Sequence, residues 1–471
     1  MTVVIVTILI LCYLLVATES VTKVNRAAIA IFAGTVGWVL YICYGTDFVT
    51  RQHGDLFSAW QEVMHLHGNN SANVKYFIVN TVFLPYVGKA AEIVLFLLAT
   101  MTIVEVLNNN GCFDFIRQLL RTRNSKKMLW MLGIITFVIS ANLDNLTTTV
   151  MMLTMMHGII PSRRQRMIFG SAILIAANCG GALTVIGNPE GLILWNSGYV
   201  TATDFSMTLL VPCLLAWAIP TYALQEMLPE RVETDWIVMP YRGDDTRLNV
   251  WQRLLMLFVG IGGLWFIPTF HNITQLSPFL GALCVLAVLW IVNEIFNRKL
   301  MNMDSMVGRR TPQVFQYGVI QMILFVLGFM LAVGVVNETG VFRKLLCFLG
   351  NDVLKNVWIS GTAAGLISCA LDNFVAAMTF ITIPQNTNLD PAIMSSEVVE
   401  NFRHGGVYWK VIAYMVMMGG NILCIGTISG LALMKMERMH MGWYFRNVGW
   451  KALVGGIAGM VALWVMITFF N

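Results

Sequence analysis

Charged residues are scarce in this chain. Asp, Glu, Lys and Arg make up 12% of its 471 residues, whereas a soluble domain carries roughly 25%. A chain with so little charge cannot cover a water-facing surface, which excludes a soluble globular protein. Hydrophobic residues make up 57% and the mean hydropathy is +0.71. These values predict an all-α polytopic membrane protein that packs against the lipid bilayer.

Several signatures of other protein classes are also missing. The apolar stretches are continuous runs of about 20 residues, not short alternating segments, which excludes a transmembrane β-barrel. None of the nine cysteines forms a C-x-x-C pair, and no H-E-x-x-H or G-x-S-x-G motif is present, so we expect neither an enzyme nor a bound cofactor. The basic residues flank apolar runs, so the net charge of +5 does not indicate a nucleic-acid partner. Residues 2–17 lack a basic leading region and are expected to form the first span.

Positive charges on both sides of one apolar stretch predict a re-entrant hairpin. Residues 128–160 are too long for one span, and basic clusters at 117–127 and 163–166 flank them. If both clusters are cytoplasmic, as the positive-inside rule requires, the segment enters and leaves on the same side. Residues 356–384 are likewise too long for one span and contain the same Leu-Asp-Asn sequence in their middle. They are therefore predicted to form a second hairpin. Counting spans from there places both termini on the outer, periplasmic side and residues 45–88 in an external loop.

The two halves of the sequence repeat each other. Ser140-x-x-Leu143-Asp144-Asn145 recurs as Ser368-x-x-Leu371-Asp372-Asn373, and the glycine pattern that begins at Gly180 recurs from Gly419. An odd number of crossings in each half turns the second upside down, as in the inverted repeats of secondary transporters. The prediction is a first repeat (1–227), a cytoplasmic linker (228–249) and a second repeat (250–471). Each repeat has five transmembrane helices, one hairpin (128–160 or 356–384) and a broken helix at the transport site (167–198 or 409–433).

Glycines and a proline predict the breaks in the two interrupted helices. Gly180, Gly181 and the Gly187-Asn188-Pro189 sequence should end the first helix within the membrane, and freed backbone groups there must face protein or a polar cavity. Amides and hydroxyls at these breaks either cap the backbone or bind an ion. The side chains in question are Asn178, Asn188, Asn421, Thr427 and Ser429.

Asp144 and Asp372 are the strongest candidates for an ion site. A carboxylate deep in the bilayer is costly and marks a functional site by default, although each Asp could also simply cap a helix. Burial favours the protonated form and a nearby cation the ionised form, so such a group can exchange a proton for sodium. Asn145, Asn373, Thr147 and Thr148 add oxygen donors. Glu190 is either a second titratable group or an ordinary residue at a helix start.

These motifs resemble those of the NhaD-type sodium/proton antiporters. The similarity lies in NLDNLTTT (142–149), in TIVE (102–105) followed by GCF (111–113), and in AANCGGA (176–182) and NRAAIA (25–30). It extends over almost the whole chain. The resemblance implies the ion-transporter superfamily fold, sodium ions and protons as the transported species, a homodimer, and a location in the bacterial inner membrane.

One departure from this family leaves a second function open. The antiporters usually carry an Asp followed by threonines after the Ile-Gly of the first break, and here the chain reads Asn188-Pro189-Glu190-Gly191. That sequence is similar to loops of arsenite and dicarboxylate transporters in the wider superfamily. The leading prediction is a cation/proton antiporter that works by alternating access, most simply sodium for protons. The alternative is a sodium- or proton-coupled transporter of a small anion such as a dicarboxylate, with helix N-termini facing the anion.

Overall fold

The computed structural model describes residues 1–22, 24–64, 70–120, 122–232, 248–297, 317–344, 354–385 and 400–470. Over this part of the chain the fold is helical, with one isolated β-bridge between Asn124 and Arg231. Eight of its helices are long and apolar enough to cross a membrane. The predicted all-α membrane protein is therefore confirmed. Most of the predicted linker, residues 233–247, lies outside the described residues.

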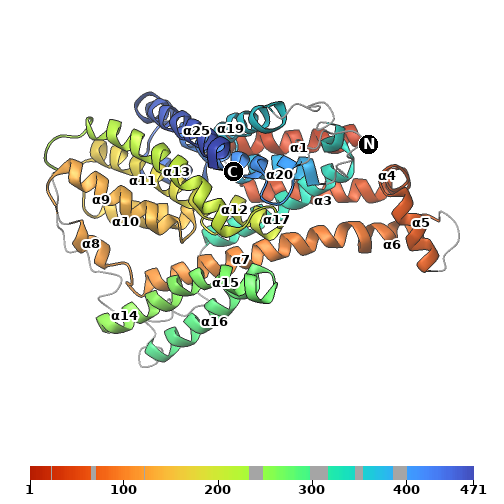
Figure 1. Cartoon of the computed structure of the whole chain (residues 1–471), viewed down its shortest axis with the longest axis horizontal. Helices are drawn as coiled ribbons and strands as arrows, with labels where there is room; N and C mark the ends of the chain where they lie inside the picture. The colour runs from red at the N-terminus through yellow and green to blue at the C-terminus, as the bar shows by residue number, and fades with distance from the viewer. Residues whose placement is uncertain are drawn as a thin grey trace.

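The first half is a series of long helices interrupted by shorter ones (Figure 1). Its first helix, α1, is followed by the short α2 and by α3, and α7 is the longest helix of this half. The helices are α1 (Thr2–Ala17), α2 (Glu19–Thr22), α3 (Arg26–Cys43), α4 (Gly45–Gln52), α5 (Gly54–Val63), α6 (Ser71–Phe77), α7 (Leu84–Asn109), α8 (Phe115–Leu119), α9 (Ser125–Ser140), α10 (Asn145–His157), α11 (Arg163–Leu183), α12 (Pro189–Asn196) and α13 (Ala202–Gln225).

The second half follows the same order of long, paired and broken helices. In Figure 1, α14, α15 and α16 lie along the lower edge, and α12 and α20 lie near the middle of the molecule. Those two middle helices also contact each other. The helices are α14 (Val250–Leu257), α15 (Gly263–Thr274), α16 (Pro278–Asn297), α17 (Tyr317–Glu338), α19 (Ser360–Ala370), α20 (Asn373–Gln385), α22 (Val407–Ile422), α23 (Ile428–Glu437), α24 (Met441–Tyr444) and α25 (Trp450–Phe470).

The structure differs from the sequence prediction between residues 45 and 88. We expected an external loop there, with the next span beginning near residue 89, but α6, a π-helical turn (Ile78–Phe83) and α7 form one continuous helix from Ser71. Its first turns bury Val74, Phe77 and Ile78, and the Phe77 ring packs edge-on against Phe57 of α5. This apolar packing stabilises helical structure on the N-terminal side of Lys89, where the charge of Lys89 had suggested that the membrane span begins. The π-helical turn ends two residues before Pro85, which cannot donate an intrahelical hydrogen bond.

A second difference concerns the glycine pairs of the broken helices. We expected Gly180 and Gly181 to interrupt the first of these helices, but both lie inside α11, which ends at Leu183. Gly419 and Gly420 likewise lie inside α22. Their small size is needed for packing: a Cβ atom on Gly180 would lie 2.2 Å from the Phe137 carbonyl oxygen of α9. The breaks themselves are at residues 184–188 and 423–427.

Candidate functional site

The first hairpin turns at Asp144, between α9 and α10. Asp144 has extended backbone angles and is the N-cap of α10. Its carboxylate accepts hydrogen bonds from the backbone N–H of Thr147 at 3.0 Å and from the Thr147 hydroxyl at 3.3 Å. An Asp that precedes a helix satisfies free N–H groups in this way. The side chain is buried, with 5% exposed, so this carboxylate sits in the protein interior with polar but uncharged partners.

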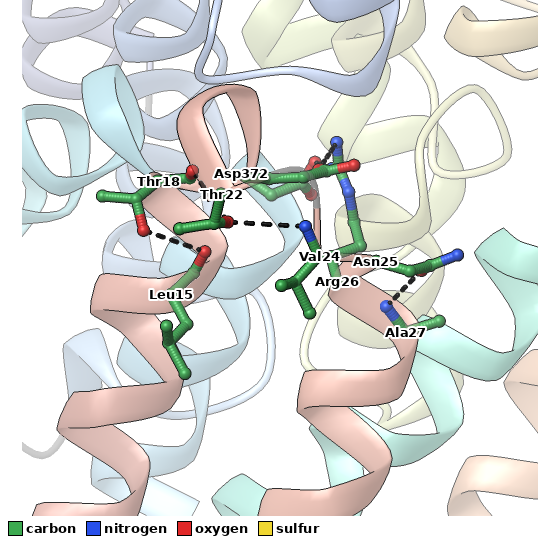
Figure 2. A network of polar contacts seen from close by, with 9 residues as sticks. Leu15, Thr18, Thr22, Val24, Asn25, Arg26, Ala27 and Asp372 are labelled. Atoms are coloured by element: carbon green, nitrogen blue, oxygen red, sulfur yellow. Dashed lines mark hydrogen bonds and ion pairs between the residues drawn. The ribbon is translucent and has the colours of Figure 1, made fainter.

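The second hairpin turns at Asp372, between α19 and α20, and its carboxylate has a charged partner. One oxygen accepts the backbone N–H of Phe374 at 3.1 Å, which again caps a helix start. The other lies 3.0 Å from Nη1 of Arg26, at the beginning of α3. Figure 2 shows the Arg26 side chain reaching from α3 to Asp372. The two hairpin carboxylates are therefore alike in local structure and unlike in electrostatic environment.

The breaks in α11–α12 and α22–α23 end at equivalent capping residues. Asn188 is the N-cap of α12 and Thr427 the N-cap of α23, both with extended backbone. The Thr427 hydroxyl accepts the backbone N–H of Gly430 at 3.0 Å, whereas the Asn188 side-chain oxygen is buried without a hydrogen-bond partner. Pro189 and Glu190 occupy the first two positions of α12. Proline suits that place because the N–H it lacks would have no intrahelical acceptor.

Matching contacts hold each hairpin against its broken helix. The Ser140 hydroxyl donates to the Ala177 carbonyl oxygen at 2.6 Å, and the Ser368 hydroxyl donates to the Val416 carbonyl oxygen at 2.8 Å. In the second half, a Cβ atom on Gly419 would lie 2.0 Å from the carbonyl oxygen of Gly365. This matches the first half, where a Cβ atom on Gly180 would meet the carbonyl oxygen of Phe137. These serines and glycines, which repeat in the sequence, thus make the same contacts in both halves.

Three asparagines connect the two halves across the interior. The Asn145 amide donates to the Asn178 side-chain oxygen at 3.3 Å, and the Asn178 amide donates to the Asn421 side-chain oxygen at 2.8 Å. Asn178 and Asn421 are buried, with 0% and 3% of each residue exposed. Buried amides need such partners because an unpaired one costs about 1–3 kcal/mol. The chain of amides joins the first hairpin and α11 to α22.

A small cavity lies where both hairpins and both broken helices meet. Its volume is about 20 Å³, room for a single water-sized particle. Two side-chain oxygens in its wall, Oε2 of Glu190 and Oγ of Ser429, are buried and have no hydrogen-bond partner among the described residues. The polar wall is built from Asn145, Glu190, Asp372, Asn373, Thr427 and Ser429. A neighbouring cavity of about 10 Å³ shares Glu190 and Asn373 and adds Thr184 and Asn188.

The structure brings most of the twelve sequence-predicted residues to this region. Six line the larger cavity and Asn188 the smaller one. Asn178 and Asn421 reach the wall through the chain of amides. Asp144 and Thr147 pair with each other next to Asn145, and Thr148 is buried with an unpartnered hydroxyl. The sequence reasoning missed Arg26 and its second partner Glu19, which lie 2.7 Å apart.

Carboxylates outnumber cations at this site. Asp372 and Glu190 line the cavity, and Asp144 precedes the wall residue Asn145. Against these three, Arg26 is the cation in contact among the residues that the structure describes, and it also pairs with Glu19. Oxygen donors around a small cavity with excess negative charge suit a hard monovalent cation or protons. The same charges repel an anion.

A protein-family model described as "Citrate transporter" matches residues 4–399. The chain belongs to this family. Family membership makes it a membrane transporter and not an enzyme. The transporter is 31% identical over 379 residues to sodium/proton antiporter 1 of Arabidopsis thaliana, a match that covers 79% of the transporter and 62% of that relative.

Two further relatives carry antiporter names. Sodium/proton antiporter 2 of Arabidopsis thaliana is 28% identical, with 79% of the transporter and 84% of the relative covered. The Na⁺/H⁺ antiporter NhaD of Vibrio parahaemolyticus is 24% identical, with 77% of the transporter and 87% of the relative covered. These matches confirm the resemblance to NhaD-type antiporters that the sequence motifs indicated.

Proposed function

We propose that this transporter exchanges sodium ions for protons by alternating access. The observation that carries the proposal is the cavity at the meeting point of both hairpins, which has two carboxylates and four amide or hydroxyl side chains in its wall. Carboxylates that bind either a proton or a sodium ion couple the two fluxes, because occupancy by one excludes the other. The names of the relatives from plants and bacteria support this exchange.

We also propose that the two halves are inverted repeats with re-entrant hairpins. The matching serine and glycine contacts support a common origin of the halves. In Figure 1, α9 and α10 lie together on the side of α8 and α14, while α4 and α5 lie at the opposite end of the molecule. This arrangement supports a hairpin that enters and leaves on one side, with domains 1–227 and 250–471 around it. A homodimer, periplasmic termini and a bacterial inner membrane belong to the same proposal.

Coupled transport of a small anion is the second candidate, because the matched family is described as a citrate transporter family. The excess of carboxylates at the cavity argues against it. An anion would need a bound cation to offset Asp144, Asp372 and Glu190. Citrate or succinate uptake driven by sodium would support this candidate over exchange.

Reconstitution in proteoliposomes tests the function directly. An imposed pH gradient is challenged in turn with sodium, lithium, potassium, citrate and succinate, and we expect sodium to dissipate it. Asp144→Asn preserves size but cannot ionise, so sodium-dependent proton movement should be lost while the protein still inserts. Glu226→Gln, which changes an exposed carboxylate paired with the exposed Lys126, is the control and should retain exchange. Exchange at the wild-type rate in Asp144→Asn would overturn the assignment of this carboxylate.

A further inference from the structure

Arg26 connects three elements at the edge of the cavity. Its Nη1 lies 3.0 Å from Asp372 at the turn before α20, and its Nη2 lies 2.7 Å from Glu19 of α2. The guanidinium also stands 5.7 Å from the ring centre of Phe325 in α17. The side chain is 11% exposed. Figure 2 shows it leaving the first turn of α3 toward Asp372. An arginine held by two carboxylates and an aromatic ring is a defined structural feature, not a solvated surface charge.

The pair makes the two hairpins unequal. Asp372 is neutralised by Arg26, whereas Asp144, in the described part of the chain, has only Thr147 as a side-chain partner. Asp372 lines the cavity and Arg26 does not. The guanidinium therefore approaches Asp372 from outside the cavity wall, while a cation in the cavity would approach it from inside.

Arg26 carries the same charge as a sodium ion. Two unit charges a few ångströms apart in a poorly solvated site repel strongly, so Arg26 and a cavity cation cannot both contact Asp372 without cost. Glu19 offers the guanidinium a second acceptor that does not depend on Asp372. In the part of the chain that the structure describes, the charged groups around Asp372 are Arg26 on α3, Glu19 on α2, Asp144 at the start of α10 and Glu190 on α12. Among these four described groups, Arg26 is the one positive charge.

We propose that Arg26 is a tethered cation that competes with the transported cation for Asp372, and that Glu19 holds Arg26 when the cation is bound. The proposal rests on the sodium/proton exchange proposed above. It gives Asp372 a positive partner in the empty transporter as well as in the loaded one, and breaking a buried ion pair by removing one partner is strongly destabilising. Arg26 thereby limits how tightly sodium is held and speeds its release.

Arg26→Gln is the first test, in proteoliposomes with sodium-driven proton movement as the readout. Removing the competitor should lower the apparent KM for sodium by at least about fivefold, the low end of typical coupling between linked ligands. The maximal rate should fall as well, because sodium leaves more slowly. Arg26→Lys keeps the positive charge on a shorter side chain. Its apparent KM for sodium should lie between those of the wild type and Arg26→Gln. Arg253→Gln, in helix α14, breaks an ion pair with Asp114; it is the matched control and should keep wild-type KM.

Glu19→Gln should act in the opposite direction. It leaves the Arg26–Asp372 pair in place and removes the negative charge of the alternative acceptor, so the apparent KM for sodium should rise. Glu226→Gln, in an exposed ion pair with Lys126, is its control. Protection against thermal unfolding by sodium, measured in detergent, should follow the same order of affinities without any transport step. Opposite shifts from two variants of one network cannot both result from misfolding.

Three outcomes would overturn the proposal. The first is an unchanged or raised KM in Arg26→Gln. The second is an unchanged or lowered KM in Glu19→Gln. The third is wild-type exchange in the double variant Arg26→Gln/Asp372→Asn, because a purely structural ion pair can be replaced by two neutral groups and a cation ligand cannot. Absence of sodium-driven proton movement in the wild type would instead overturn the proposed exchange itself.

Discussion

At the scale of single residues, the repeat is informative where its two copies differ. Glu190 and Ser429 hold equivalent places after the two breaks, and both have a buried oxygen without a hydrogen-bond partner at the same cavity. Of the two, Glu190 alone can ionise. The resemblance to the NhaD-type antiporters implies an Asp two positions earlier in the sequence, where this chain has Asn188. The structure places Glu190 at the cavity, where it can serve as that carboxylate.

The role of Glu190 is tested by the pH dependence of sodium affinity. A falling pH favours protons over sodium at the carboxylates, so the apparent KM for sodium should rise as pH falls. The slope of log KM against pH counts the protons displaced, and Glu190→Gln should reduce it by about one. Proteoliposome assays at several sodium concentrations measure the slope, with Glu226→Gln as the control. If Glu190 only favours the helix start, the variant costs about 0.3–1 kcal/mol of stability and the slope is unchanged.

At the scale of helices, the position of each hairpin depends on how closely two backbones can approach. Gly180 packs on the Phe137 carbonyl and Gly419 on the Gly365 carbonyl. Small residues allow such contacts between membrane helices. The serine hydroxyls that reach across from Ser140 and Ser368 need the same short separation. The hairpin tips, and with them Asp144 and Asp372, are held in place by this packing.

Gly180→Ala should therefore destabilise the transporter. The added Cβ would overlap the Phe137 carbonyl oxygen, and forcing extra volume into a packed site costs about 1–3 kcal/mol. Thermal unfolding in detergent should show a lower Tm. The same substitution at Gly88, in helix α7 with open space around it, should leave the Tm unchanged or raise it, because alanine favours a helix over glycine by about 0.5–1 kcal/mol. Equal Tm values for the two variants would contradict the packing argument.

At the scale of the whole molecule, the proposed inverted repeat requires both ends of the first hairpin to lie on one side of the membrane. Exposed Lys127 and Arg164 flank this hairpin. In a background without native cysteines, Lys127→Cys and Arg164→Cys should both be labelled by an impermeant thiol reagent from the cytoplasmic side alone. A cysteine in segment 385–400 should be labelled from the outside. Labelling of Lys127→Cys and Arg164→Cys from opposite sides would make the hairpin a complete span and contradict the inverted repeat.

Local properties of the sequence were enough to predict the membrane class and the all-helical fold, and they nominated candidate residues that the structure places around one small cavity. Hydropathy follows directly from composition, and the helix breaks near Pro189 follow from its missing N–H group. The duplicated Leu-Asp-Asn motif could be found without coordinates, because finding it requires only a comparison of the two halves of the sequence. The start of a helix at Ser71 was not predictable in the same way, because Lys89 suggests a boundary that packing overrides.

The contacts that give the site its character were decided by tertiary structure. Arg26 and Asp372 are separated by 346 positions, and nothing in the sequence around either one identifies the other. A basic residue at the edge of an apolar run is usually an interfacial charge, and the sequence alone suggests that role for Arg26. The fold instead places its guanidinium beside Asp372, at the turn before α20. The composition determined that this is a membrane protein, because the free energy of transferring apolar side chains from water to lipid is a sum over the residues of the chain. Which carboxylate has a cation beside it depends on distances between elements, and only the packed helices set those.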